Sequence, residues 1–168
     1  MLPLHPVVVH FPIVLAVLLP IFALGALWAI RKGTTPRRAW SIPVALAAAL
    51  ALSALVAVET GEDQDERVEQ VVPEQPLEAH EEAAELFLTL SGSLALLAAA
   101  GLARGRVGGI ARGLGTAGAF ALVALAVLVG HSGGRLVYEH GAASAYTGTT
   151  QRVSAPAPRD GSDDGDDR

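Results

Sequence analysis

Residues 7–30 read VVVHFPIVLAVLLPIFALGALWAI, an apolar run whose only ionisable side chain is His10. Because an α-helix rises about 1.5 Å per residue, about 20 apolar residues can cross the roughly 30 Å of hydrocarbon in a bilayer. Three further apolar blocks follow, at residues 40–58, 83–103 and 114–130. Backbone groups without hydrogen-bond partners are costly in lipid, so all four blocks are predicted to be helices. The predicted fold class is all-α, a four-helix transmembrane bundle with helices over about 7–30, 40–58, 77–103 and 110–131.

The charged residues of the connecting segments predict the orientation of this bundle. Basic residues concentrate in the first and third connections, as Arg31, Lys32, Arg37 and Arg38, then Arg104, Arg106 and Arg112. The segment between the second and third blocks, residues 59–85, has eleven acids and Arg67 as its only base. The positive-inside rule places the two basic connections in the cytoplasm. We therefore expect a multi-pass protein of the cell (inner) membrane, with both termini and the acidic segment outside the cytoplasm.

Two compositional features limit the chemistry and the domain organisation. The chain has no cysteine, which excludes disulfides, thiolate metal sites, iron–sulfur clusters and covalent haem attachment. Residues 148–168 are rich in Thr, Ser, Pro, Gly and Asp, and such a segment cannot bury enough apolar surface to offset its ordering entropy. We expect a membrane domain over residues 1–147 and a disordered acidic tail over 148–168.

All five histidines fall at the same predicted end of the bundle, outside the cytoplasm. They are His5, His10, His80, His131 and His140. Glu59 and Glu62 follow the second block on the same side. Neutral imidazole is the commonest protein ligand of transition metals and the side chain that titrates nearest physiological pH. The one-sided set therefore predicts a haem, metal or proton-handling site.

Two motifs at opposite ends of the chain carry a resemblance to a known family. Residues 5–13 read HPVVVHFPI, and residues 131–141 read HSGGRLVYEHG; between them lie the turn ETGE at 59–62 and a histidine at position 80. Over residues 3–142 the chain resembles a bacterial membrane family catalogued as domain of unknown function 2231. The resemblance implies a small four-helix membrane protein in which the histidines matter, but it implies no activity. Some relatives look as if they are joined to c-type cytochrome modules, which suggests electron transfer.

The first hypothesis is b-type haem ligation for electron transfer. Two imidazoles from facing helices can hold a haem iron from both sides within a four-helix bundle. His10, His80 and His131 are the candidate ligands because each is near a helix end. Arg135 could pair with a haem propionate and Tyr138 could donate a hydrogen bond. Replacing His131 by alanine is expected to abolish binding.

Two alternatives remain open. A divalent metal, zinc or copper, could be held by two or three of the histidines together with Glu59 or Glu62; the candidate histidines are His5, His10, His80, His131 and His140. Residues 80–84 begin like the HExxH zinc motif but lack its second histidine. The other alternative is a cofactor-free structural or partner-binding subunit, in which Gly133 and Gly134 form a turn after the last helix.

The net charge and the motifs of the sequence argue against several other classes of function. A net charge of -5, with the bases in short connections, argues against nucleic-acid binding. Nucleotide-binding and nucleophile motifs are absent from the sequence. We expect an electron-transfer or binding protein rather than a catalyst, in contact with the lipid bilayer and with a redox protein or cytochrome as its partner. The sequence is also compatible with a homodimer.

Overall fold

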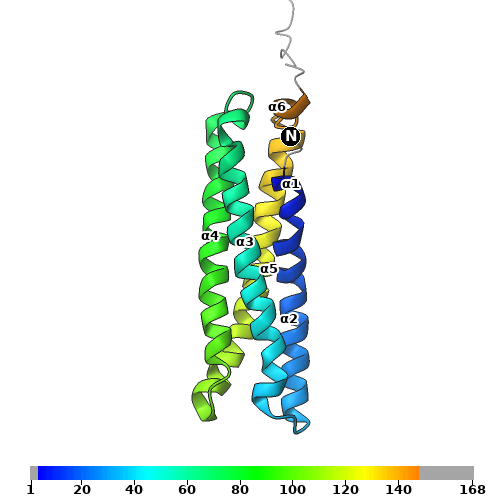
Figure 1. Cartoon of the computed structure of the whole chain (residues 1–168), viewed down its shortest axis with the longest axis vertical. Helices are drawn as coiled ribbons and strands as arrows, with labels where there is room; N and C mark the ends of the chain where they lie inside the picture. The colour runs from blue at the N-terminus through cyan, green and yellow to red at the C-terminus, as the bar shows by residue number, and fades with distance from the viewer. Residues whose placement is uncertain (1–3, 148–168) are drawn as a thin grey trace, which may run out of the picture.

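A computed structural model describes residues 4–147, and within this range every regular element is an α-helix. The elements are α1 (His5–Val8), α2 (His10–Arg31), α3 (Pro36–Val68), α4 (Glu74–Ala100), α5 (Gly105–Tyr138) and α6 (Ser144–Thr147). The long helices run side by side in an up-and-down bundle (Figure 1). Four helical spans, with α1 and α2 counted as one, are long and apolar enough to cross a membrane. The all-α fold and its four candidate spans are as predicted; the expected tail lies outside the described residues.

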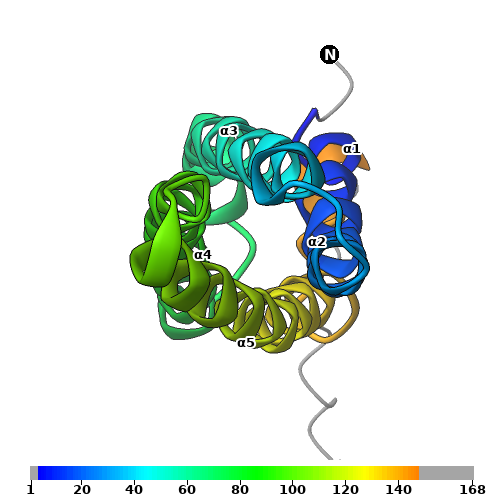
Figure 2. The ribbon, with the colours of Figure 1, turned by 90° about the horizontal axis from the view of Figure 1, so that it is seen from below.

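The long helices form a ring in which each has two neighbours. Viewed along the bundle, the order is α2, α3, α4, α5 and back to α2 (Figure 2), and the same four pairs make the main helix contacts. As a result, α2 and α4 are diagonally opposite, as are α3 and α5. The ring consists of two helical hairpins, α1–α2 with α3 and α4 with α5.

The two hairpins have almost the same dimensions. Their first spans, His5–Arg31 and Glu74–Ala100, are both 27 residues long, and their second spans, Pro36–Val68 and Gly105–Tyr138, are 33 and 34 residues long. In both hairpins the first span runs away from the end that holds α1 and α6, and the second returns to it (Figure 1). The bundle therefore has an approximate two-fold relation between its halves.

Two helices continue further than the sequence predicted. α3 continues to Val68, so the segment 59–62 is helical and is not a turn. α5 continues to Tyr138, so Gly133 and Gly134 are also helical. Each glycine costs about 1 kcal/mol relative to alanine in a helix. Side chains that pack against Gly61 and Gly133, described below, explain why small residues occupy these positions.

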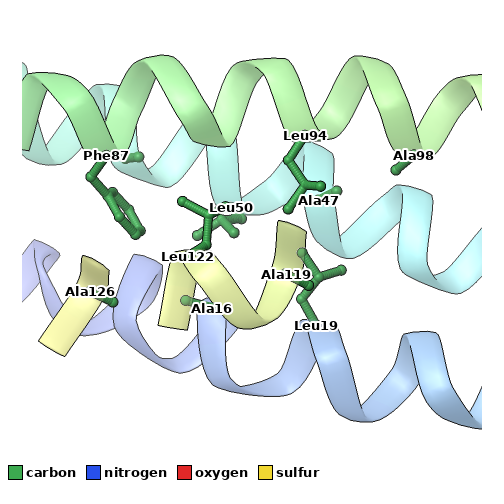
Figure 3. Packing of buried hydrophobic residues seen from close by; sticks show 11 residues of the cluster. Ala16, Leu19, Ala47, Leu50, Phe87, Leu94, Ala98, Ala119, Leu122 and Ala126 are labelled. Carbon is green, nitrogen blue, oxygen red and sulfur yellow. The ribbon is translucent and has the colours of Figure 1, made fainter. Parts of the chain in front are cut away.

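The core is built from alanine and leucine, with Phe87 at one end. The cluster shown in Figure 3 contains Ala16, Leu19, Ala47, Leu50, Ala54, Phe87, Leu94, Ala98, Ala119, Leu122 and Ala126. Small residues let helices approach closely, which matters in a bilayer because lipid tails are as apolar as the side chains. Large apolar residues instead point outward, such as Leu96, whose surface is 76% exposed. This distribution suits a bundle surrounded by lipid.

The two ends of the bundle differ in chemistry. The histidine end holds His5, His10, His80, His131 and His140, together with the acids of residues 59–85. The arginine end holds the α2–α3 and α4–α5 connections. There, three side chains donate hydrogen bonds to the last carbonyls of α4 and the following turn: Trp40 Nε1 to Ala98 (2.9 Å), Arg112 Nη1 to Gly101 (2.6 Å) and Arg37 Nε to Leu102 (3.3 Å). These donors satisfy carbonyls that a helix C-terminus leaves unpaired.

Candidate cofactor site at the histidine end

A cavity of about 800 Å³ lies between the helices at the histidine end. Its walls are mostly apolar and include small residues from three of the four long helices: Ala54 and Ala57 on α3, Ala84 on α4, and Ala126 and Gly130 on α5. Phe87 of α4 also lines it. Ligand sites typically occupy 300–1,000 Å³ and combine apolar walls with a few placed polar groups. The cavity has the size and lining of a small-molecule site.

His5 is one of the polar groups that line this cavity. It opens α1, is half-buried, and its Nδ1 is 2.8 Å from the carbonyl oxygen of Ala57 on α3. Because a carbonyl oxygen only accepts, we assign the ring hydrogen to Nδ1. The ring lies against Gly61, where a Cβ would be 3.2 Å from His5 Cε1. The other ring nitrogen, Nε2, therefore keeps its lone pair.

His80 is held in the same way in the other hairpin. It lies on α4, is half-buried, and its Nδ1 is 2.8 Å from the hydroxyl oxygen of Ser132 on α5. That hydroxyl donates its own hydrogen to the carbonyl of Val129 (2.9 Å), so it accepts from His80 Nδ1. The ring lies against Gly133, where a Cβ would be 3.1 Å from His80 Cε1. Nε2 of His80 is again the nitrogen with a lone pair.

The two histidines are related by the approximate two-fold of the bundle. Each comes from the first span of its hairpin and binds the second span of the same hairpin, and both hydrogen bonds join residues 52 positions apart. Both rings line the cavity and are close enough to interact electrostatically. The arrangement places one imidazole from each half of the protein in the lining of the same cavity.

Carboxylates accompany the histidines around the cavity. Glu62 and Asp65 line it from α3, and Glu81 and Glu85 line it from α4. No lysine or arginine is among the described residues that line it. The cavity is therefore an electronegative environment, which favours positive charge at its centre.

Of the other residues predicted for the site, His10, Glu62 and Tyr138 line the same cavity and the rest lie outside its lining. His10 lines the rim of the cavity but is exposed, and His131 is exposed on α5 outside the cavity lining. Glu59 and His140 also lie outside the lining. Within residues 4–147, no group of three or more histidine, aspartate or glutamate side chains is arranged to hold a metal ion. The structure thus brings together His5 and His80 and leaves the remaining members of the set dispersed.

Arg135 and Tyr138 are both directed toward solvent or lipid. Arg135 Nε is 2.8 Å from Glu139 Oε2, in an exposed ion pair between residues one helical turn apart. The hydrogen bond from Arg135 holds the pKa of the Glu139 carboxyl below its usual range. Tyr138 is 89% exposed and is one of the residues that line the cavity. A propionate role for Arg135 would require it to leave Glu139.

Sequence reasoning missed the residues that position the imidazoles. The sequence patterns predicted turns at Gly61 and Gly133 and no role for Ser132 or Ala57 at the site. One signal in the sequence could have indicated them. In both hairpins a histidine near the start of one span, His5 or His80, is followed by a glycine near the end of the next span, Gly61 or Gly133. That signal has meaning only when both spans are known to continue as helices past the glycines.

Comparison with known proteins identifies the family of this chain. No curated protein and no solved structure matches the chain. The family model described as "Predicted membrane protein (DUF2231)" matches residues 1–145, which covers all six helices apart from the end of α6. The protein therefore belongs to the DUF2231 family of predicted membrane proteins.

Proposed function

We propose that this protein binds b-type haem in the cavity at the histidine end, with His5 and His80 as the two axial ligands, and transfers electrons through it. The observation that carries the proposal is the pair of half-buried imidazoles, each hydrogen-bonded through Nδ1, on opposite hairpins around an apolar cavity of about 800 Å³. Haem proteins built on four-helix bundles use the same elements, ligands that project inward from facing helices.

The ligand set favours haem over a simple zinc or copper ion. A protein-bound zinc ion takes three or four protein ligands. The porphyrin supplies four nitrogen ligands of its own, so its iron needs two from the protein. The cavity lining contributes His5 and His80 as half-buried imidazoles, and its apolar walls suit a macrocycle better than a bare cation.

The hydrogen bonds of the two rings support a ligand role. Donation from Nδ1 to a carbonyl or hydroxyl oxygen sets the tautomer in which Nε2 is the ligand atom, and it raises the basicity of that atom. Ala57 plays this part for His5 and Ser132 plays it for His80. The surrounding carboxylates would stabilise ferric over ferrous iron, because the oxidised centre carries more positive charge.

The predicted orientation of the protein determines on which side of the membrane the haem site would lie. With the basic connections in the cytoplasm, the histidine end and both termini are outside it, in an inner-membrane protein. The redox partner would then be an extracytoplasmic protein such as a cytochrome. The acidic ends of α3 and α4 are suited to a partner with a basic surface.

The test is an absorption spectrum of the full-length protein purified in mild detergent, oxidised and reduced, with metal analysis of the same sample. We expect the bands of a low-spin b-type haem. The variants His5→Ala and His80→Ala should each lose the low-spin spectrum, whereas His131→Ala should keep it. Circular dichroism would show whether each variant retains its helices.

Three results would contradict the proposal. Folded wild-type protein without haem, after growth with adequate haem, would favour the cofactor-free subunit. A colourless preparation with stoichiometric zinc or copper would favour the metal site. Loss of haem in His131→Ala with retention in His5→Ala would show that the ligands are those expected from the sequence.

A further inference from the structure

The end of the cavity that faces water is closed by an apolar cap. Five residues form a buried cluster there, Val68, Val72, Leu77, Leu136 and Ala142, with Val71 and Ala145 packed against it. On α4 and α5 the cap lies one helical turn beyond His80 and Gly133. The chain after α5 turns at Gly141, which has a φ of 73°, and Ala142 N donates to the Leu136 carbonyl (2.9 Å). The cap separates the two imidazoles from the aqueous end.

The exposed residues of the cavity lining concentrate on α1–α2 and α5, and we infer that the cavity opens between them. On this side its lining includes Ile13 from α2 and Gly130 and Val137 from α5, all three exposed. A Cβ added to Gly130 or to the neighbouring lining residue Gly134 would meet nothing within 4 Å. On α3 and α4, by contrast, most lining residues are buried or half-buried. The α2–α5 interface is also the loosest of the four in the ring.

The surface next to this opening carries exposed apolar side chains together with three exposed bases, His10, His131 and Arg135, and it has fewer acids than the rest of the histidine end. Val7 and Phe11 are exposed on one side of it, and Val137 and Tyr138 on the other. The exposed residues at the same end of α3 and α4 are largely acidic: Glu59, Glu62, Asp63, Glu66, Glu69, Glu74, Glu78, Glu82 and Glu85. An exposed apolar face on a membrane protein is the face that lipid covers.

We propose that the gap between α1–α2 and α5 is a lateral portal, through which the cavity takes its haem from the bilayer and not from the aqueous phase. The inference rests on the proposed function for the identity of the occupant. Haem is an amphiphile with a flat apolar ring, so a narrow opening toward lipid suits it. Gly130 and Gly134 keep the portal open because neither places a side chain in it.

The first experiment follows haemin loading into the apo-protein in liposomes. Haemin is either partitioned into the vesicles beforehand or supplied in water on albumin, and the low-spin spectrum is followed with time. Loading from the vesicles should be the faster route, and Gly130→Leu and Gly134→Leu should slow it by at least about tenfold. Gly113→Leu is the matched control, because Gly113 is an exposed α5 glycine with no neighbour within 4 Å, far from the portal.

The outcomes separate this inference from the function on which it rests. If both portal variants load haem at the wild-type rate, the portal proposal is wrong but the haem site is not contradicted. The same holds if Gly113→Leu slows loading as much as the portal variants do. Wild-type protein that never acquires the low-spin spectrum overturns the haem site.

A second measurement tests the portal without haem. The chain has no cysteine, so Ala84→Cys places a single thiol at a half-buried, cavity-lining position. A maleimide with a long alkyl chain, dissolved in the vesicles, should label this thiol faster than a charged maleimide in water. Adding Gly130→Leu should slow the alkyl reagent alone. Faster labelling by the charged reagent would show that the aqueous end is the entrance, and the portal would be wrong.

Discussion

Two glycines determine how close the imidazole rings of the cavity can come to the neighbouring helices. The His5 ring packs against Gly61 and the His80 ring packs against Gly133. A Cβ atom at either position would come too close to the ring. The hydrogen bonds to Ala57 and Ser132 then hold each ring with Nε2 available. Glycine is unfavourable in a helix, so its presence in these two helices has a local structural reason.

A methyl group at these positions should disturb the site without weakening the fold. In Gly133→Ala the new Cβ would be 3.1 Å from His80 Cε1, closer than the roughly 3.5–4.0 Å of an ordinary carbon contact. We expect a shifted low-spin spectrum and faster haem loss, while the alanine raises helix stability by up to about 1 kcal/mol. Spectra and thermal unfolding of the same sample measure both effects.

The control for this prediction is Gly113→Ala, which makes the same change in helix propensity with no neighbour within 4 Å. It should gain stability and keep the wild-type spectrum. If Gly133→Ala also keeps the wild-type spectrum and rate of haem loss, His80 is not held against α5 as described.

The helix ends are finished by side chains and short segments that differ between the two ends of the bundle. At the arginine end, side-chain donors cover the C-terminus of α4, and Arg112 places a buried cation where the helix dipole favours one. At the histidine end, α3 and α5 extend as helices beyond their apolar blocks and carry the cap over the cavity. Both ends are therefore tied by contacts between consecutive helices.

Trp40 should contribute more to stability than the other tryptophan of the chain. Its indole is 1% exposed and donates to the Ala98 carbonyl, whereas Trp28 is 65% exposed. Trp40→Phe removes the donor and leaves a void, for a loss of about 1–3 kcal/mol. Trp28→Phe should change little. Unfolding by SDS, followed by circular dichroism, measures both, and equal losses would show that the Ala98 contact is unimportant.

The cap should loosen at alkaline pH. Burial raises the pKa of the Tyr146 phenol above its ordinary value, and Tyr146 lines the cavity from α6. A group whose pKa is raised by folding stabilises the folded form below its unfolded pKa, and this contribution is lost as pH rises through the folded pKa. Amide hydrogen exchange in residues 139–147, corrected for its intrinsic pH dependence, should increase in that window.

The matched variant for the cap is Tyr146→Phe, which keeps the ring and removes the ionisable hydroxyl. It should abolish the alkaline increase in exchange. An increase that persists in Tyr146→Phe would assign the pH effect to another group.

Across the entire bundle, the two hairpins repeat one arrangement around a shared cavity. Each contributes one imidazole and one wall, and the core below is a single alanine–leucine cluster. Acids collect at the histidine end and bases at the arginine end. By the positive-inside rule, the bases in the short connections at the arginine end predict that this end lies in the cytoplasm.

The orientation can be measured with single cysteines, because the natural chain has none. Glu69→Cys lies at the histidine end and Thr34→Cys in the α2–α3 connection at the arginine end, both at exposed positions. In intact cells an impermeant maleimide should label Glu69→Cys alone, and both should react after permeabilisation. Labelling of Thr34→Cys alone in intact cells would reverse the topology and place the cavity on the cytoplasmic side.

The sequence was sufficient for the spans, the helical class and the family. Those depend on local quantities, the length of each apolar block against the bilayer thickness and the cost of unpaired backbone groups in lipid. The motifs at residues 5–13 and 131–141 identified the family, and they drew attention to the histidines at one end of the bundle. They did not show which histidines line the same cavity as half-buried rings.

The pairing of His5 with His80 required the three-dimensional arrangement, because it depends on how far each helix continues and how it is rotated. If α5 had ended at Gly133, His131 could have turned inward. Because the helix continues, His131 stays exposed on its outer face and Ser132 is placed next to His80. Likewise, the continuation of α3 through Gly61 creates the surface on which the His5 ring lies. Helix rotation and register arise from packing between distant segments, and no single stretch of the chain encodes them.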